Sequence, residues 1–265
     1  KLYRQQYQKH LQPKLTYGFH GRELDILKIE KLLIDSEDYK DRRHLLLRGM
    51  IGVGKSTLLS YLAWWWEETR WADRVIKLSL GKRNFSWKRI LQDIGEQIYL
   101  PKSEGLDAFK KLDDEISMEG EIRDQFTKPD TNWILMIDQA NPNHLTLRDG
   151  LTTSVADELK RFLMSLPPDL AVVYGSRNDE QWLSEGTFEQ NVYQLHGLRK
   201  EEQYLMAKRI LRDHQLQLNN FTSDESLRYD FEELMELMQG FPSMMEVILP
   251  LLASRPLEKD LEQYH

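Results

Sequence analysis

Short runs of apolar residues alternate with longer stretches whose apolar residues recur every three or four positions. The short runs are rich in Leu, Ile and Val, and they predict buried β-strands at residues 44–48, 74–80, 133–137, 170–175 and 191–195. The longer stretches predict amphipathic helices at residues 23–33, 56–70, 87–99 and 154–166. Strands that alternate with helices are typical of a parallel sheet covered by crossover helices, so we expect an α/β fold.

The organisation of the chain changes near residue 196. Strand patterns end there, and helical patterns follow at residues 200–213, 224–239 and 243–253. We therefore predict an N-terminal flank over residues 1–16, an α/β domain over residues 17–196 and a small helical lid subdomain over residues 197–265.

The stretch from residue 101 to residue 131 has the least definite pattern. It carries an acidic run, whose carboxylates we interpret as one solvated helix face. These carboxylates belong to Asp113, Asp114, Glu115, Glu119 and Glu121.

Composition excludes several classes of protein. The chain has 265 residues, of which 40% are hydrophobic and 30% charged, the balance of a water-soluble globular protein. No apolar run approaches the roughly 20 residues that a membrane span needs, which excludes a transmembrane protein. The 36 basic and 43 acidic residues give a net charge of −7, which argues against a general nucleic-acid binder.

The metal-binding residue types narrow the chemistry further. Because the chain has no cysteine, it can form neither a disulfide nor a thiolate metal site. Its seven histidines are never closer than ten positions apart, which excludes an HExxH zinc helix. The chain begins at Lys1 rather than at Met, so we expect it to be a piece of a longer protein.

One motif carries a specific chemistry. Residues 49–56 read GMIGVGKS, which matches the phosphate-binding P-loop pattern and lies between a predicted strand and a predicted helix. Gly49, Gly52 and Gly54 allow backbone N–H groups to turn inward toward phosphate oxygens. Lys55 is expected to reach the β- and γ-phosphates, and the Ser56 hydroxyl is expected to ligate Mg²⁺. The alternative is an ordinary glycine-rich turn with an incidental lysine.

A second metal ligand is expected at the end of another strand. Residues 134–137 are apolar and Asp138 follows them, so Asp138 is our candidate to hold Mg²⁺ together with Ser56. The next residue is Gln139, whose amide can orient a water molecule but is a poor proton acceptor. We therefore predict slow hydrolysis of a bound nucleoside triphosphate.

A third candidate follows the apolar run 171–174. Arg177 comes directly after Gly175 and Ser176, at the carboxyl end of a predicted strand, where ligands bind in α/β sheets. Its guanidinium could contact the γ-phosphate. The alternative is a surface arginine that pairs with Asp179 or Glu180.

Together these motifs resemble the STAND ATPases, the signalling branch of the AAA+-like P-loop proteins that includes NACHT and NB-ARC domains of innate-immunity and cell-death receptors. Residues 17–24, YGFHGREL, resemble the family's GRE motif, and Ser176-Arg177 resembles its sensor turn. Gly240-Phe241-Pro242 resembles the GLP motif of its helical subdomain. Gln139 departs from the pattern, because most members carry a second acid there.

The resemblance implies a five-stranded parallel sheet with the sensor strand between the P-loop strand and the Asp138 strand, and a nucleotide buried between this sheet and the lid. Arg22 would then lie near the ribose and adenine, and Pro242 would close over the base. For Arg22 an ordinary helix start, and for Pro242 the first turn of a helix, are the alternatives. The residues expected at the nucleotide are Gly21, Arg22, Gly49, Gly52, Val53, Gly54, Lys55, Ser56, Thr57 and Pro242.

These observations predict an ATP/ADP-Mg²⁺ switch, the oligomerisation module of a multidomain cytoplasmic signalling ATPase. The resemblance implies self-association in the ATP-bound state, and it implies that the winged-helix, sensor and effector domains lie outside this sequence. One alternative is an AAA+ ATPase that hydrolyses ATP steadily, of the origin-recognition or remodelling kind. Another is a small-molecule kinase with the same P-loop.

Overall fold

In the computed structural model, the five predicted apolar runs form one sheet. The strands are β1 (His44–Arg48), β2 (Arg74–Ser79), β3 (Trp133–Asp138), β4 (Ala171–Ser176) and β5 (Val192–Gln194). They are parallel and ordered β2-β3-β4-β1-β5. The predicted parallel α/β fold is therefore confirmed, including the position of β4 between β1 and β3. β3 and β4 are buried on both faces along their whole length, which explains why they read as continuous apolar runs.

The structure describes residues 15–35, 43–80, 86–99, 101–139, 155–177, 183, 187–188 and 191–253. Within these residues, the chain divides into two compact units. The first unit contains the described parts of residues 26–49 and 55–194, and the second contains residues 15–25, 50–54 and 195–253. Residues 50–54 of the P-loop therefore belong to the same compact unit as the C-terminal helices, whereas Lys55 belongs to the unit that contains the sheet.

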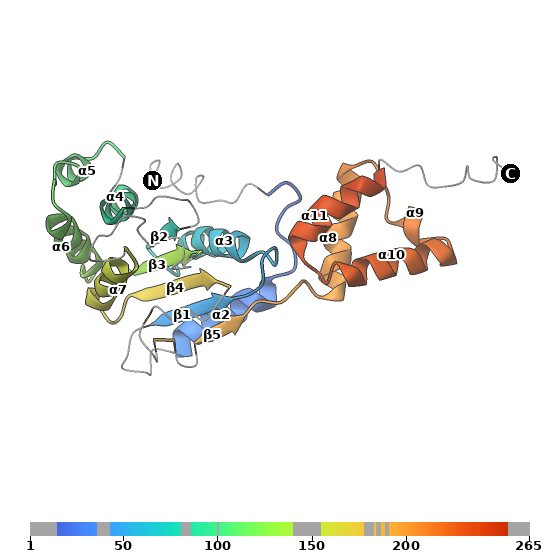
Figure 1. Ribbon diagram of the computed structural model, residues 1–265, viewed down its shortest axis with the longest axis horizontal. Coiled ribbons are helices and arrows are strands. Elements are labelled where there is room, and N and C mark those ends of the chain that lie inside the picture. The colour runs from blue at the N-terminus through green and yellow to red at the C-terminus, as the bar shows by residue number, and fades with distance from the viewer. Residues whose placement is uncertain are drawn as a thin grey trace. The chain divides into compact units, whose positions relative to one another are not determined.

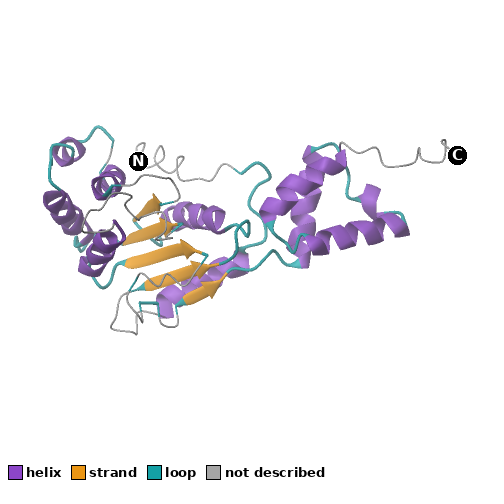
Figure 2. Ribbon diagram, viewed as in Figure 1, coloured by secondary structure: helices purple, strands orange, loops and turns teal. Residues whose placement is uncertain are grey.

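Helices surround the sheet of the first unit (Figures 1 and 2). They are α2 (Glu23–Asp35), which begins in the second unit, and α3 (Lys55–Glu68), α4 (Trp87–Ile98), α5 (Glu104–Phe109), α6 (Glu115–Phe126) and α7 (Val155–Ser165). Ser86, Ser103 and Asp114 cap the starts of α4, α5 and α6 through their side-chain oxygens. Within the described residues, no helix is both long enough and apolar enough to cross a bilayer.

The acidic stretch differs from its prediction most clearly at Glu119. Asp113 and Asp114 are exposed as expected, but Glu119 is only 8% exposed. Its Oε1 accepts hydrogen bonds from Trp87 Nε1 at 2.8 Å and from Arg161 Nη2 at 2.7 Å. The prediction of a solvated carboxylate is therefore wrong for Glu119, because α6 packs against α4 on the side that carries this residue.

The second unit contains α8 (Lys200–Asp213), α9 (Asn219–Thr222), α10 (Glu225–Leu237), α11 (Pro242–Ile248) and the 3₁₀-helix η3 (Leu249–Ala253). Its core includes Ile210, Phe231 and Met245. The predicted helix at residues 243–253 instead begins at Pro242 and becomes a 3₁₀-helix from Leu249. Pro250 has no N–H group to continue the α-helical hydrogen bonds, which accounts for the change.

Candidate nucleotide-binding site

The first unit holds a hydroxyl, a carboxylate and two cations near the carboxyl ends of its strands. Ser56, in the first turn of α3, donates a hydrogen bond from Oγ to Asp138 Oδ1 at 3.0 Å. Asp138 ends β3 and is 3% exposed. Lys55 donates from Nζ to the carbonyl oxygen of Gly49 at 2.7 Å. The N–H of Gly49 donates to the carbonyl of Ser176 at 3.2 Å, which fixes the start of the loop to the end of β4.

The charges of this group act on one another. Burial lowers the pKa of Lys55, the positive charge of Arg177 lowers it further, and the negative charge of Asp138 raises it. Arg177 directly follows β4 and is exposed. Its alternative partners Asp179 and Glu180 lie outside the described residues. Lys55 and Arg177 are thus two cations close enough to repel each other, which suits an anionic ligand.

The donor set also fits Mg²⁺. The Ser56 hydroxyl and the Asp138 carboxylate supply two adjacent oxygen atoms, and Mg²⁺ at nucleotide sites uses few protein oxygens together with phosphate and water. Among the described residues, no group of three or more His, Asp or Glu side chains could hold a metal ion without such help. This arrangement therefore suits a metal that arrives with a phosphate ligand.

Gln139 follows Asp138 with its backbone in the left-handed region, at a φ of 57°. This conformation is uncommon for a residue with a side chain, and the Gln139 side chain is exposed. Thr57 lies half-buried in the first turn of α3.

The second unit contains the middle of the P-loop and the start of α11. Gly52 and Gly54 have φ values of 82° and 99°, which favour glycine. Ser243 Oγ donates to the carbonyl oxygen of Gly52 at 3.1 Å, and a Cβ atom on Gly52 would lie 2.2 Å from this Oγ. Pro242 Cγ lies 3.7 Å from the position that a Cβ atom on Gly54 would take. The first residues of α11 therefore pack against the P-loop glycines.

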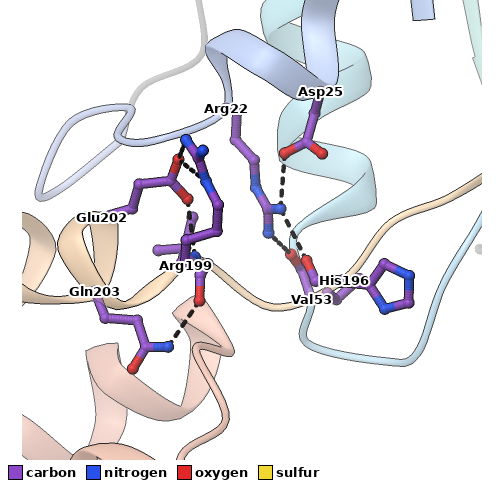
Figure 3. A network of polar contacts seen from close by, with 8 residues as sticks. Arg22, Asp25, Val53, His196, Arg199, Glu202 and Gln203 are labelled. Carbon is purple, nitrogen blue, oxygen red and sulfur yellow. Dashed lines mark hydrogen bonds and ion pairs between the residues drawn. The ribbon is translucent and has the colours of Figure 1, made fainter. Parts of the chain in front are cut away.

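Arg22 donates hydrogen bonds to three protein groups (Figure 3). Its Nη2 donates to the carbonyl oxygen of Val53 at 2.7 Å. Its Nη1 donates to the carbonyl oxygen of His196 at 2.8 Å and to Asp25 Oδ2 at 3.0 Å. Arg22 is 4% exposed. Arg22 thus links the P-loop to the segment that leads into α8.

Gly21 allows the segment that carries Arg22 to approach α8 closely. A Cβ atom on Gly21 would lie 2.4 Å from Glu202 Cβ, so no side chain fits there without a shift. Glu202 accepts hydrogen bonds from the backbone N–H and the side chain of Arg199 (Figure 3). Asp25, Glu202 and Ser243 were not among the residues that the sequence motifs predicted for the site. The only local signal was that each lies within a few residues of a motif or of a predicted helix start.

Comparison with known proteins adds evidence on the fold. No family model matches the chain, and no curated protein matches its sequence. Among solved structures, the chain is similar to Cdc6p from Pyrobaculum aerophilum, with 14% identity and a TM-score of 0.53 over 93% of this chain and 65% of that chain. It is also similar to the Orc1 protein from Aeropyrum pernix, solved in complex with DNA, with 13% identity and a TM-score of 0.50 over 93% of this chain and 63% of that chain.

The chain therefore spans just under two thirds of the length of each of these proteins. Similarity at this level of identity establishes the fold alone, a parallel five-stranded sheet flanked by helices. It does not single out the STAND class.

Proposed function

We propose that this chain is the nucleotide-binding part of an ATPase that switches between ATP- and ADP-bound states with Mg²⁺. The observation that carries the proposal is the hydrogen bond between Ser56 and Asp138, which are 82 positions apart in the sequence. It joins the last residue of a P-loop motif to an acid at the end of β3, a strand that β4 separates from the P-loop strand β1. A P-loop ATPase needs this pair to hold its metal ion.

Each residue then has a role that its surroundings support. Lys55 balances the charge of the β- and γ-phosphates, and Ser56 and Asp138 hold Mg²⁺. When bound, Mg²⁺ neutralises phosphate charge and orients the terminal phosphate. Arg177 contacts the γ-phosphate from the end of β4. Gln139 orients the attacking water without accepting its proton, so hydrolysis is slow.

The start of α11 offers a way for the phosphates to affect the helical unit. Pro242 and Ser243 contact Gly54 and Gly52, which belong to the loop that is to bind phosphate. A ligand that changes this loop therefore also changes the surroundings of α11. A difference of a few kcal/mol in nucleotide affinity between two α11 positions is enough to shift their populations.

The finer proposal is a STAND-type switch, with an α/β domain over residues 17–196 and a lid over residues 197–265. It self-associates when ATP is bound and passes the signal to domains outside this sequence. A second candidate function is steady ATP hydrolysis by an initiator-type ATPase that acts on DNA. The fold similarity to Cdc6p and to a DNA-bound Orc1 protein favours that candidate.

The test is to measure binding of ATP and ADP to the purified chain by calorimetry, with and without Mg²⁺. We expect Lys55→Ala to weaken binding about 100-fold or more, because it removes the main phosphate cation. Asp138→Asn should weaken binding only in Mg²⁺. The matched control is Lys111→Ala, an exposed lysine after α5. Equal ATP affinity in the wild type and Lys55→Ala would contradict the proposal.

Two measurements on the purified chain, its bound nucleotide and its ATPase rate, distinguish the two candidate functions. Tightly held ADP that is released only on denaturation supports the switch. Rapid turnover of added ATP, or DNA binding that weakens steeply with salt, supports the initiator-type ATPase.

A further inference from the structure

Lys77 is a half-buried lysine on the edge strand β2 to which the functions above give no role. Its backbone is fixed on the open edge of the sheet by Gln97 of α4. The N–H of Lys77 donates to Gln97 Oε1 at 2.8 Å, and Gln97 Nε2 donates to the carbonyl oxygen of Lys77 at 3.0 Å. This pair of bonds replaces those of a neighbouring strand. The position from which the lysine side chain extends is therefore well defined.

The side chain of Lys77 leads to the candidate magnesium site through α3. Its Nζ donates a hydrogen bond to Ser60 Oγ. Ser60 Oγ in turn donates to the carbonyl oxygen of Ser56 at 2.8 Å. Ser56 Oγ donates to Asp138 Oδ1 at 3.0 Å. Hydrogen bonds and the backbone of Ser56 thus connect the partly buried ammonium group of Lys77 to both proposed metal ligands.

The charge of Lys77 also acts on this site. Burial lowers the pKa of Lys77, and the negative charge of Asp138 raises it, so the two groups attract each other. A charged ammonium in this place costs desolvation energy that an apolar residue would avoid. Ser60, which accepts the hydrogen bond from Lys77 Nζ, is neutral. Asp138 is therefore the charge that offsets part of this cost.

We propose that Lys77 is a positioning residue whose fixed positive charge substitutes for part of the metal's charge beside Asp138. With Lys77 in place, the site binds metal-free nucleotide more tightly than the site of a Lys77 variant that lacks the charge. It also binds Mg²⁺ less tightly than that variant. The physical reason is that one carboxylate attracts both cations, while the two cations repel each other. This inference rests on the proposed nucleotide-binding function.

The test compares the full chain with Lys77→Met, Lys77→Arg and the exposed control Lys111→Met, which changes the net charge equally. Binding of a fluorescent ATP analogue is measured in EDTA and over a Mg²⁺ titration. We expect Lys77→Met to weaken binding in EDTA about five- to tenfold and to lower the half-saturating Mg²⁺ concentration about fivefold. Lys77→Arg keeps the charge, and Lys111→Met does not alter the site, so both should stay within about twofold of the wild type.

Several results would overturn the inference. If Lys77→Met weakens binding equally with and without Mg²⁺, then Lys77 only supports α3. If Lys77→Met behaves like Lys111→Met, then its charge does not reach the site. Should Lys77→Met fail to fold, Lys77→Gln carries the same expectation.

The failure of the underlying function has a different signature. If the wild type binds no ATP, or binds it as well after Lys55→Ala, then the proposed nucleotide site is wrong and the inference falls with it. If binding depends on Lys55 but the Mg²⁺ titrations of Lys77→Met and the wild type coincide, then only the inference about Lys77 is wrong.

Discussion

Replacing Arg22 by methionine tests whether this buried guanidinium holds the P-loop in place. Methionine has a similar length and is apolar, so the change removes the donors without opening a large cavity. The carbonyl oxygens of Val53 and His196 and the carboxylate of Asp25 then each lose a hydrogen bond. The expected destabilisation depends on which of these groups can turn to water instead.

The bond to Val53 is buried, so its carbonyl oxygen bears the full cost of an unmade hydrogen bond, about 1–3 kcal/mol. The bond to His196 is partly buried and adds about 1 kcal/mol. The side chain of Asp25 is 21% exposed and can be rehydrated, so it adds little. We therefore expect the free energy of unfolding to fall by about 3 kcal/mol, with the Val53 oxygen as the largest contributor.

The assay is urea unfolding, followed by circular dichroism. The matched control is Arg228→Met in α10, because Arg228 and its partner Glu232 are 56% and 43% exposed and lie 3.9 Å apart. An exposed pair of this kind contributes less than about 1 kcal/mol. Because Val53 lies in the P-loop, Arg22→Met should also weaken ATP binding about tenfold through loss of preorganisation.

Equal unfolding free energies for Arg22→Met and Arg228→Met would refute the reasoning. Loss of ATP binding without loss of stability would instead show that Arg22 contacts the nucleotide, as the family resemblance implied.

Three further predictions concern other positions. Gly52→Ala should weaken ATP binding about tenfold, because its φ of 82° costs roughly 1–2 kcal/mol and its Cβ atom would displace Ser243. The control Gly120→Ala, in α6 with open space around it, should stabilise the protein by about 0.5–1 kcal/mol in the same urea assay. The hydrogen bond from Tyr99 lowers the pKa of Glu121 below its usual value, so the stability it gives is present above about pH 4.3 and is lost as the pH falls through the folded pKa. Unfolding measured at several pH values should therefore show Glu121→Gln less stable than the wild type at pH 7, and a constant difference down to acidic pH would exclude this linkage. Gln139→Glu should raise the steady-state ATPase rate about tenfold or more, and an unchanged rate would mean that Gln139 does not limit the chemistry.

The strands could be predicted to within one or two residues at each end. β3 and β4 are buried on both faces, so their apolar runs are continuous and need no tertiary information to detect. The glycine-rich turn at residues 49–56 could likewise be predicted, because the P-loop motif is defined by residue types at fixed spacing within one loop. The pairing of Ser56 with Asp138 was also expected, since both lie at ends of elements that a parallel sheet brings to the same edge.

Glu119 could not be predicted, because the sequence does not say which side of a helix will meet another helix. Its acidic neighbours suggested a solvated face. In the structure, Trp87, 32 positions away, and Arg161, 42 positions away, supply its donors. The acidic run suggested a helix face without a definite period, and only the packing of α6 on α4 showed that the Glu119 carboxylate is buried.

The contacts of the basic residues near the P-loop motif could not be predicted from the sequence either, and these contacts affect how the site would bind phosphate. The sequence suggested Arg22, Lys55 and Arg177 as ligands of the nucleotide, and it gave Lys77 no role. In the structure, Arg22 donates hydrogen bonds to Asp25, His196 and Val53, and the Lys77 side chain donates to Ser60. Lys55 and Arg177 instead repel each other, and that repulsion is relieved when an anion binds. The phosphate charge should therefore be met mainly by Lys55 and Arg177, while Arg22 and Lys77 act on the backbone and the metal ligands that surround it.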